Sequence, residues 1–149
     1  MKIGVSACLL GNKVRYDGRA KGCAEVMEAL YDHEVYLLCP EVMGGLPVPR
    51  IPSEVQGARV VNAKGTEVTE EYTSGSRVCL SIVKKKKLDA VILKAKSPAC
   101  GSHEIYDGTF THTLINGMGV FAKMCKAEGI RIFDETEIEE LKKFLEGGC

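Results

Sequence analysis

Short apolar segments rich in β-branched residues alternate with segments of helical periodicity along this chain. The apolar segments span residues 2–9, 34–38, 89–95 and 130–133. Segments of this kind are typical of parallel strands that are covered on both faces. Because strands that alternate with helices build parallel sheets, we expect an α/β fold: a Rossmann-like three-layer domain with a mainly parallel sheet.

The segments between these strands carry apolar residues at helical spacing. The predicted helices span residues 23–31, 69–83, 117–128 and 134–145. Thr69 is the predicted N-cap of the second helix, and Gly129 ends the third. Asp134 and Glu137 form a predicted capping box for the last helix. Residues 59–68 instead have the pattern of an inserted β-hairpin that turns at residues 63–65.

The composition indicates one soluble globular domain that spans residues 1–149. Hydrophobic residues make up 45% of the chain, and 20 basic side chains balance 20 acidic ones. A net charge of zero provides no general attraction to nucleic acids or anionic membranes. No apolar stretch approaches the ~20 residues that span a bilayer, and the first residues read as a buried strand better than as a signal peptide. We therefore expect a cytoplasmic protein.

Seven cysteines, an odd number, occur in the chain, and none of them forms a CxxC motif. In a reducing compartment such cysteines are thiols, metal ligands or nucleophiles more often than disulfides. Cys8 ends the first predicted strand, Cys39 follows the second, and Cys100 closes the loop after the third. Ligands of open α/β sheets bind outside the carboxyl ends of the strands. The topology is therefore expected to bring these three cysteines to one site.

The other four cysteines lack this placement. Cys23, Cys79 and Cys125 lie on apolar faces of predicted helices, where a free cysteine acts as a small hydrophobic residue. Cys149 is the last residue and is expected to fray. We therefore assign none of these four to the site.

Polar side chains accompany the three cysteines in the same loops. Glu41 lies two residues after Cys39 and can act as a general base, or simply as a solvated loop acid. Ser97 can bind a substrate or move a proton, or it can form the turn of its loop. Lys94 can offset thiolate charge, and His103 can serve as a ligand or an acid, although both residue types are also ordinary at surfaces.

Three thiolates from distant loops suit three purposes. They can hold a zinc ion with an open fourth position, as in catalytic zinc sites. They can bind three irons of a 4Fe–4S cluster and leave the fourth iron free for a substrate, or one of them can act alone as a nucleophile. Soft thiolate ligands favour zinc or iron–sulfur over magnesium or calcium. The residues alone leave the choice between zinc and iron open.

A series of motifs surrounds these residues, in the order SACLLG, RYDG, CPE…GGL…PR.P.E, G.EVT, LK..SP.CG…IYDG and G.GV.A, from residue 6 to about residue 133. Together they resemble the YbbK-like family, a domain of unknown function whose members are known as thiouracil desulfurases. The resemblance implies a 4Fe–4S cluster held by Cys8, Cys39 and Cys100, with one iron not bound by the protein. It also implies catalytic roles for Glu41 and Ser97.

Two positions depart from the family pattern. Val14 stands where many relatives have a cysteine, so this position cannot supply a ligand here. Ala99 replaces a small polar residue often found before the last cysteine.

The activity that the resemblance implies is an iron–sulfur-dependent desulfurase. Such an enzyme cleaves the C–S bond of thiouracil or its nucleoside hydrolytically and gives the oxo base and sulfide. The expected partner is this small thiolated base or nucleoside. Thiolated tRNA and other nucleic acids are not expected, because neither a basic net charge nor a second RNA-binding domain supports them.

Two alternatives use the same three cysteines. One is a zinc-dependent nucleobase hydrolase, although the chain lacks the H-x-E and P-C-x-x-C motifs of zinc deaminases. The other is a non-catalytic sensor that binds a metal or a ligand. The sequence leaves the oligomeric state open.

Overall fold

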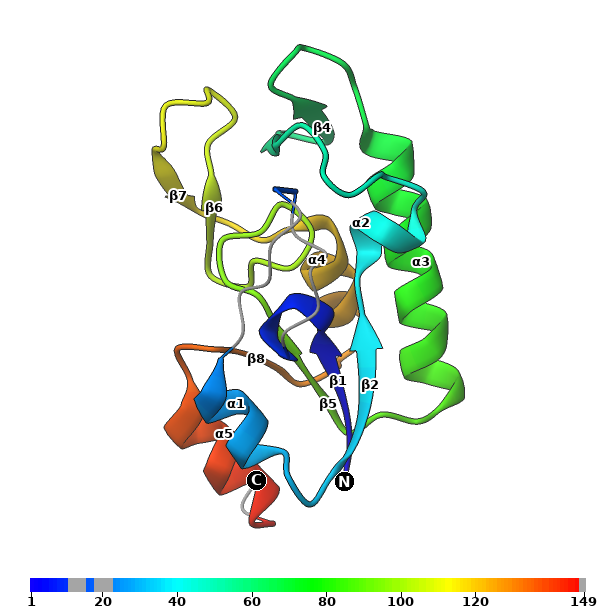
Figure 1. The fold of residues 1–149 in the computed structure, drawn as a ribbon, viewed down its shortest axis with the longest axis vertical. Coiled ribbons are helices and arrows are strands. Elements are labelled where there is room, and N and C mark those ends of the chain that lie inside the picture. The colour runs from blue at the N-terminus through cyan, green and yellow to red at the C-terminus, as the bar shows by residue number, and fades with distance from the viewer. Residues whose placement is uncertain (11–15, 18–22, 148–149) are drawn as a thin grey trace.

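A computed structural model of the chain describes residues 1–10, 16–17 and 23–147. The central sheet consists of β1 (Lys2–Ser6), β2 (Glu34–Leu38), β5 (Ala90–Leu93) and β8 (Ile132–Asp134), in the order β2-β1-β5-β8 (Figure 1). Every neighbouring pair in this sheet is parallel. The predicted α/β fold is confirmed, because each of the four apolar segments contributes one of these strands.

Helices cover both faces of the sheet. They are α1 (Ala24–Ala29), α3 (Thr69–Lys85), α4 (Val120–Ala127) and α5 (Ile138–Leu145). Successive strand residues point to opposite faces, and β5 shows the result. Ala90 and Ile92 pack in one buried cluster with α1 and α5, whereas Val91 and Leu93 pack in a second cluster with α3 and α4. The predicted three-layer arrangement is therefore confirmed.

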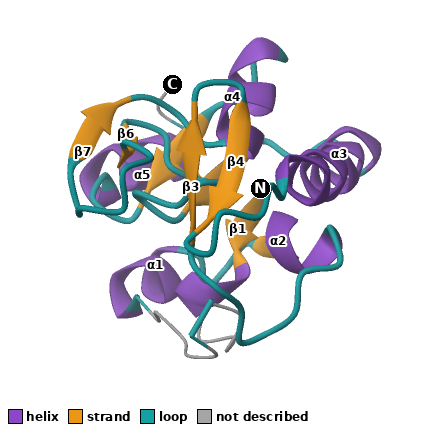
Figure 2. Cartoon of the chain, turned by 90° about the horizontal axis from the view of Figure 1, so that it is seen from above, coloured by secondary structure: helices purple, strands orange, loops and turns teal. Residues whose placement is uncertain are grey.

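Two antiparallel hairpins lie beyond the carboxyl ends of the sheet strands (Figure 1 and Figure 2). They pair β3 (Ser53–Gln56) with β4 (Arg59–Asn62), and β6 (Glu104–Tyr106) with β7 (Leu114–Asn116). The predicted hairpin insertion is confirmed, and β4 has a second partner that was not predicted. Its main ladder is with β3. The predicted pairing within 59–68 is present as the bridge of Val61 with Glu67, with hydrogen bonds from the Asn62 N–H to the Thr66 carbonyl at 2.9 Å and from the Val68 N–H to the Val60 carbonyl at 2.8 Å. Pro49 and Pro52 give the segment around β3 the signature of a loop, which concealed this strand.

The helix ends agree in part with the predicted signals. Gly129 adopts a φ of +72° after α4, as a C-terminal glycine does. The side chain of Glu137 accepts a hydrogen bond from the Asp134 N–H at 3.1 Å, so the predicted capping pair is in contact in the turn before α5. Thr69 is not an N-cap, because α3 already begins at this residue. Its Oγ1 instead accepts a hydrogen bond from the Val60 N–H at 2.9 Å and ties α3 to β4.

Two short helical segments follow the first two strands directly and were not predicted. They are the 3₁₀ helix η1 (Ala7–Leu10), after β1, and α2 (Pro40–Met43), after β2. The predicted first strand, residues 2–9, therefore ends at Ser6. Within residues 1–10, 16–17 and 23–147, no helix combines the length and the apolar character that crossing a membrane requires.

The helix α2 lies against α3 with backbone touching backbone. A Cβ atom at Gly75 of α3 would lie 1.7 Å from the Pro40 carbonyl oxygen, and one at Gly44 would lie 1.9 Å from the Glu71 carbonyl oxygen. Both distances are far below the 3.0 Å that real Cβ contacts respect. The two glycines therefore set how closely α2 approaches α3, and with it the position of the residues at the start of α2.

We expect the substitution Gly75→Ala to push α2 away from α3 and to lower the free energy of unfolding by about 1–3 kcal/mol, because backbone atoms cannot make room as a flexible side chain can. Urea denaturation of the metal-free protein measures this change. Ser74→Ala, at an exposed position of the same helix, is the control and should leave the midpoint unchanged or slightly higher. Equal stability of the wild type and the Gly75→Ala protein would contradict this packing.

Candidate active site

The order of the strands creates a switch point between β1 and β5. From β1 the sheet extends to β2 on one side, and from β5 it extends to β8 on the other. Ligands of open α/β sheets bind at such a point, beyond the carboxyl ends of the strands. Cys8 lies in η1 directly after β1, Cys39 is the N-cap residue of α2 directly after β2, and Cys100 lies in the turn after β5. All three predicted cysteines thus follow strands that end at the same edge.

The three thiols interact electrostatically, and two of them are shielded from water. Cys8 is 9% exposed and Cys100 is 4% exposed, whereas Cys39 is only partly buried. Burial raises the pKa of Cys8 to about 11 and also raises the pKa values of Cys39 and Cys100. The charge of Cys39 contributes further to the raised pKa of both other thiols. The metal-free site therefore holds neutral thiols at pH 7.

Hydrogen-bond donors from the backbone and from a buried hydroxyl lower the pKa values of two of these thiols and so oppose the effect of burial. The N–H groups of Val42 and Glu41, at the start of α2, lower the pKa of Cys39. The hydroxyl of Ser6, which is 3% exposed at the end of β1, lowers the pKa of Cys100 by hydrogen bonding. Hydrogen bonds to cysteine sulfur stabilise the thiolate form, which is the form that binds metals.

The loop that carries Cys100 is fixed by Ser97 and by the start of α4. Ser97 Oγ accepts hydrogen bonds from the N–H groups of Ala99 and Cys100, both at 3.1 Å. The Ala99 carbonyl accepts the Phe121 N–H at 2.9 Å, and the Pro98 carbonyl accepts the Val120 N–H at 3.0 Å. Ser97 therefore forms the turn, as one of its two predicted readings proposed.

The start of α4 also explains why small residues occur beside this loop. A Cβ atom at Gly119 would lie 2.4 Å from the backbone carbonyl carbon of Ala99. Ala99 itself is fully buried. The alanine that departs from the family pattern thus lies where the loop and α4 are in closest contact.

Glu41 occupies the first turn of α2, and its charge contributes to the raised pKa values of Cys8, Cys39 and Cys100. Its Oε2 accepts a hydrogen bond from the Tyr72 hydroxyl at 2.6 Å.

The same carboxylate oxygen forms an ion pair with Arg50 Nη2 at 3.3 Å, and the Arg50 and Glu41 side chains are 5% and 16% exposed. Burial, reinforced by the charge of Glu41, raises the pKa of Tyr72 far above its usual range, so the phenol stays protonated and donates. Sequence reasoning placed Glu41 in the site but missed both partners. Tyr72 was read only as part of an apolar helix face, and Arg50 only as a member of a motif.

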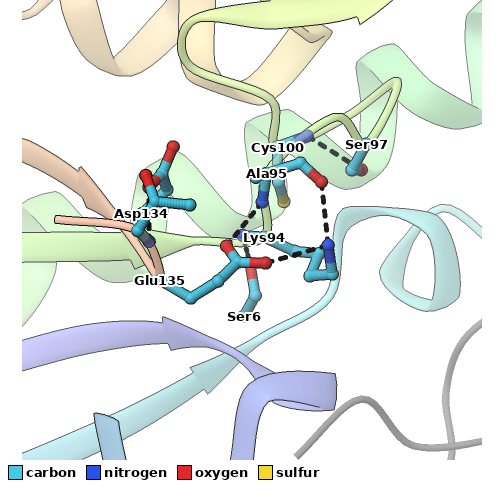
Figure 3. Close-up of polar contacts among 8 residues, drawn as sticks. Ser6, Lys94, Ala95, Ser97, Cys100, Asp134 and Glu135 are labelled. Carbon is cyan, nitrogen blue, oxygen red and sulfur yellow. Dashed lines mark hydrogen bonds and ion pairs between the residues drawn. The ribbon is translucent and has the colours of Figure 1, made fainter. Parts of the chain in front are cut away.

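A second ion pair joins the residues that directly follow β5 and β8 (Figure 3). Lys94 Nζ lies 2.9 Å from Glu135 Oε2 and 3.0 Å from the Ala95 carbonyl oxygen, while Glu135 Oε1 accepts the Ala95 N–H at 2.8 Å. The charge of Lys94 lowers the pKa of Cys8 and opposes the larger effect of burial. Sequence reasoning missed Glu135, although the strand-end rule that found the cysteines also applies to the residue directly after β8.

His103 pairs with carboxylates at the start of α5. Its Nε2 lies 2.8 Å from Glu137 Oε1 and 3.8 Å from Asp134 Oδ2, and its side chain is 61% exposed. The hydrogen bond to Glu137 raises the pKa of His103. The contacts with Glu137 and Asp134 account for the position of the His103 side chain. The predicted hydrophobic roles of Cys79 and Cys125 agree with their complete burial, whereas Cys149 and Val14 lie outside the described residues.

The spacing of the three thiols bears on the metal that they can hold. Three sulfur ligands of one tetrahedral zinc ion lie about 3.8 Å apart, given Zn–S bonds of about 2.3 Å. Among the described residues, the group of ligand atoms within 4.8 Å of one another is His103, Asp134 and Glu137. The sulfurs of Cys8, Cys39 and Cys100 do not form such a group. Their soft thiolates are the donors that 4Fe–4S clusters use, with each thiolate at a different iron.

Comparisons with known proteins agree with this arrangement. A family model described as 2-thiouracil desulfurase matches residues 3–137. A protein of Bacillus subtilis (strain 168), described as uncharacterized protein YbbK, is 37% identical over 147 residues, which cover 92% of this chain and 97% of that protein. The solved structure of a 4Fe–4S-dependent thiouracil desulfidase, TudS, is similar with a TM-score of 0.90 and 40% identity, over 97% of each chain.

The buried thiols predict how the stability of the metal-free protein depends on pH. A thiol with the ordinary pKa of 9.0 loses its proton in the unfolded chain, whereas Cys8 keeps its proton in the folded protein up to about pH 11 and Cys125 up to about pH 12. The folded state then binds more protons, so the free energy of unfolding should fall as the pH rises from 9 toward 11. Each such thiol contributes a slope of about 1 kcal/mol per pH unit.

Urea denaturation at several pH values under reducing conditions measures this slope. Cys125→Ala removes one buried thiol and should make the decline shallower, whereas Cys23→Ala, at a partly exposed position, should leave it unchanged. A stability that is constant between pH 8 and 11 would show that the thiols titrate normally.

Proposed function

The chain belongs to the 2-thiouracil desulfurase family, and we propose that it removes sulfur from thiouracil or its nucleoside to give the oxo base and sulfide. The observation that carries this proposal is that three thiols, two of them buried, and one carboxylate follow strands at the switch point of the sheet. The reaction consumes one water. Its oxygen forms the new C–O bond, the C–S bond breaks, and its two protons leave with the sulfur as hydrogen sulfide, so no electrons are exchanged.

Cys8, Cys39 and Cys100 would hold a 4Fe–4S cluster through three of its irons, which leaves one iron without a protein ligand. Support comes from the number of thiols that follow strands at this edge of the sheet, and from the donors of Ser6 and α2 that favour thiolate forms. When bound, the cluster supplies a Lewis-acidic iron that can take up the sulfur of the substrate. All other steps are assigned to side chains of the chain itself.

Glu41 is the general base in this scheme. Both contacts described for its carboxylate, from Tyr72 and from Arg50, are made to Oε2. We therefore assign Oε1 to the attacking water, whose proton it takes as the water oxygen approaches the carbon that bears sulfur. Tyr72 and Arg50 act as positioning residues, because they fix the direction of the carboxylate without reaching the reacting atoms.

Ser97 has a double role in the proposal. Its oxygen accepts two N–H groups and thereby shapes the Cys100 turn. Its hydroxyl proton can still be donated, and we assign this donor to the oxygen or nitrogen that gains negative charge as water attacks.

The proposed substrate is a free base or nucleoside in the cytoplasm. A small ring suits a site enclosed by three loops, and reduced thiols persist in the cytoplasm. Nothing about the net charge of zero favours a nucleic-acid substrate.

The cysteine assignment is tested by purifying the protein without oxygen and measuring iron and labile sulfide. We expect the wild type to be brown, with about four irons per chain, and to release sulfide from 2-thiouracil or 4-thiouracil. Cys8→Ser should be colourless and inactive, whereas Cys23→Ser should keep both properties. A colourless but fully active Cys8→Ser protein would refute the cluster, and a wild type with iron but no sulfide release would favour the sensor.

The role of Glu41 is tested by Glu41→Gln, which keeps the size of the side chain but removes the base. We expect kcat to fall by about 10²–10⁴-fold at unchanged iron content. Tyr72→Phe removes only one donor to Oε2 and should lower kcat by a smaller factor. Glu67→Gln, in an exposed ion pair, is the matched control. Wild-type turnover by Glu41→Gln would eliminate this residue as the base.

A further inference from the structure

Lys94 and Glu135 form a partly buried ion pair at the carboxyl ends of β5 and β8. The two side chains are 21% and 18% exposed. The pair of Lys84 and Glu128, composed of the same residue types, is 57% and 39% exposed on the surface. Exposed pairs of this kind contribute little and are screened by salt. The Lys94–Glu135 pair is shielded enough for its charges to act on their neighbours.

Each end of the pair is tied to the backbone that carries the thiols. Glu135 binds the Lys94 ammonium with one oxygen and the Ala95 N–H with the other, and the ammonium also donates to the Ala95 carbonyl (Figure 3). The Lys94 N–H donates to Ser6 Oγ at 2.9 Å, and Ser6 lies two residues before Cys8. The ammonium is therefore fixed relative to the Cys8 loop and cannot swing away as a surface lysine does.

The two charges of the pair act unequally at Cys8. The positive charge of Lys94 has a larger influence there than the negative charge of Glu135. Lys94 is thus the cation whose charge favours the thiolate form of Cys8, against the charges of Glu135 and Glu41. Three thiolates and a released sulfide are all anions, and burying anions requires such a counter-charge.

We propose that Lys94, held in place by Glu135, is a positioning residue that sets the reduction potential of the cluster and its affinity for anionic sulfide. The proposal rests on the proposed function, because it requires a cluster on Cys8, Cys39 and Cys100. It assigns no covalent step to Lys94. A nearby positive charge favours the more negative oxidation state of a cluster and holds anions more tightly, and a nearby negative charge does the reverse.

The test is an equilibrium redox titration of proteins purified without oxygen and matched for iron content. Lys94→Met removes the positive charge and should lower the midpoint potential. Glu135→Gln removes the negative charge and should raise it. The double variant, which keeps a side chain of similar size at each position, should return close to the wild-type value. Lys94→Arg retains the charge and should also stay close to it.

Activity assays give a second readout. Inhibition by added sodium hydrosulfide should weaken severalfold in Lys94→Met and be restored in Lys94→Arg. The variants Lys84→Met and Glu128→Gln alter the exposed ion pair. They should change neither the midpoint potential nor the inhibition by sodium hydrosulfide.

The outcomes separate this inference from the function on which it rests. A wild type without iron defeats the proposed function. A wild type with its cluster, in which Lys94→Met and Glu135→Gln shift the potential in the same direction or not at all, overturns the electrostatic role alone. If Lys94→Met fails to fold, the other two variants still test the inference. It requires that Glu135→Gln raises the midpoint potential and that Lys94→Arg leaves it unchanged, and any other result overturns it.

Discussion

The parallel register of β1 with β2 on one side and with β5 on the other is the constraint on which the site depends. Val5 lies level with Leu37 and with Ile92, so the three strands leave the sheet at similar heights. A slip by one residue in either pair would turn buried side chains of a strand toward the opposite face. The apolar layers on both faces thus fix the register, and the register fixes where Cys8 and Cys39 emerge.

Each carboxylate that borders the thiols is matched by a cation. Glu41 has Arg50, and Glu135 has Lys94. A buried charge without a partner is costly, so these pairs allow acidic groups to stand beside the thiols. The thiols themselves are neutral when no metal is bound, because burial raises their pKa values.

The sequence predicted the features that repeat along the chain or follow from strand direction. Apolar segments located the four sheet strands, and the strand-end rule brought Cys8, Cys39 and Cys100 together. Glu41 followed from its distance to Cys39. Partners that depend on packing between distant elements were missed, because Tyr72, Arg50 and Glu135 reach the site from separate parts of the chain. The strand β3 was missed because its flanking prolines resemble a loop, and Thr69 was misassigned because β4 takes up its hydroxyl.

The close contact of α2 with α3 limits how sequences of this kind can be recombined. Gly44 and Gly75 each meet a carbonyl of the opposite helix, so neither position tolerates a side chain while the other helix stays in place. The packing of α2 therefore depends on α3, and the packing of α3 depends on α2. A chimaera that takes β2 and α2 from one relative and α3 from another brings together two halves that were not selected to fit, and any mismatch falls on the residues that follow Cys39.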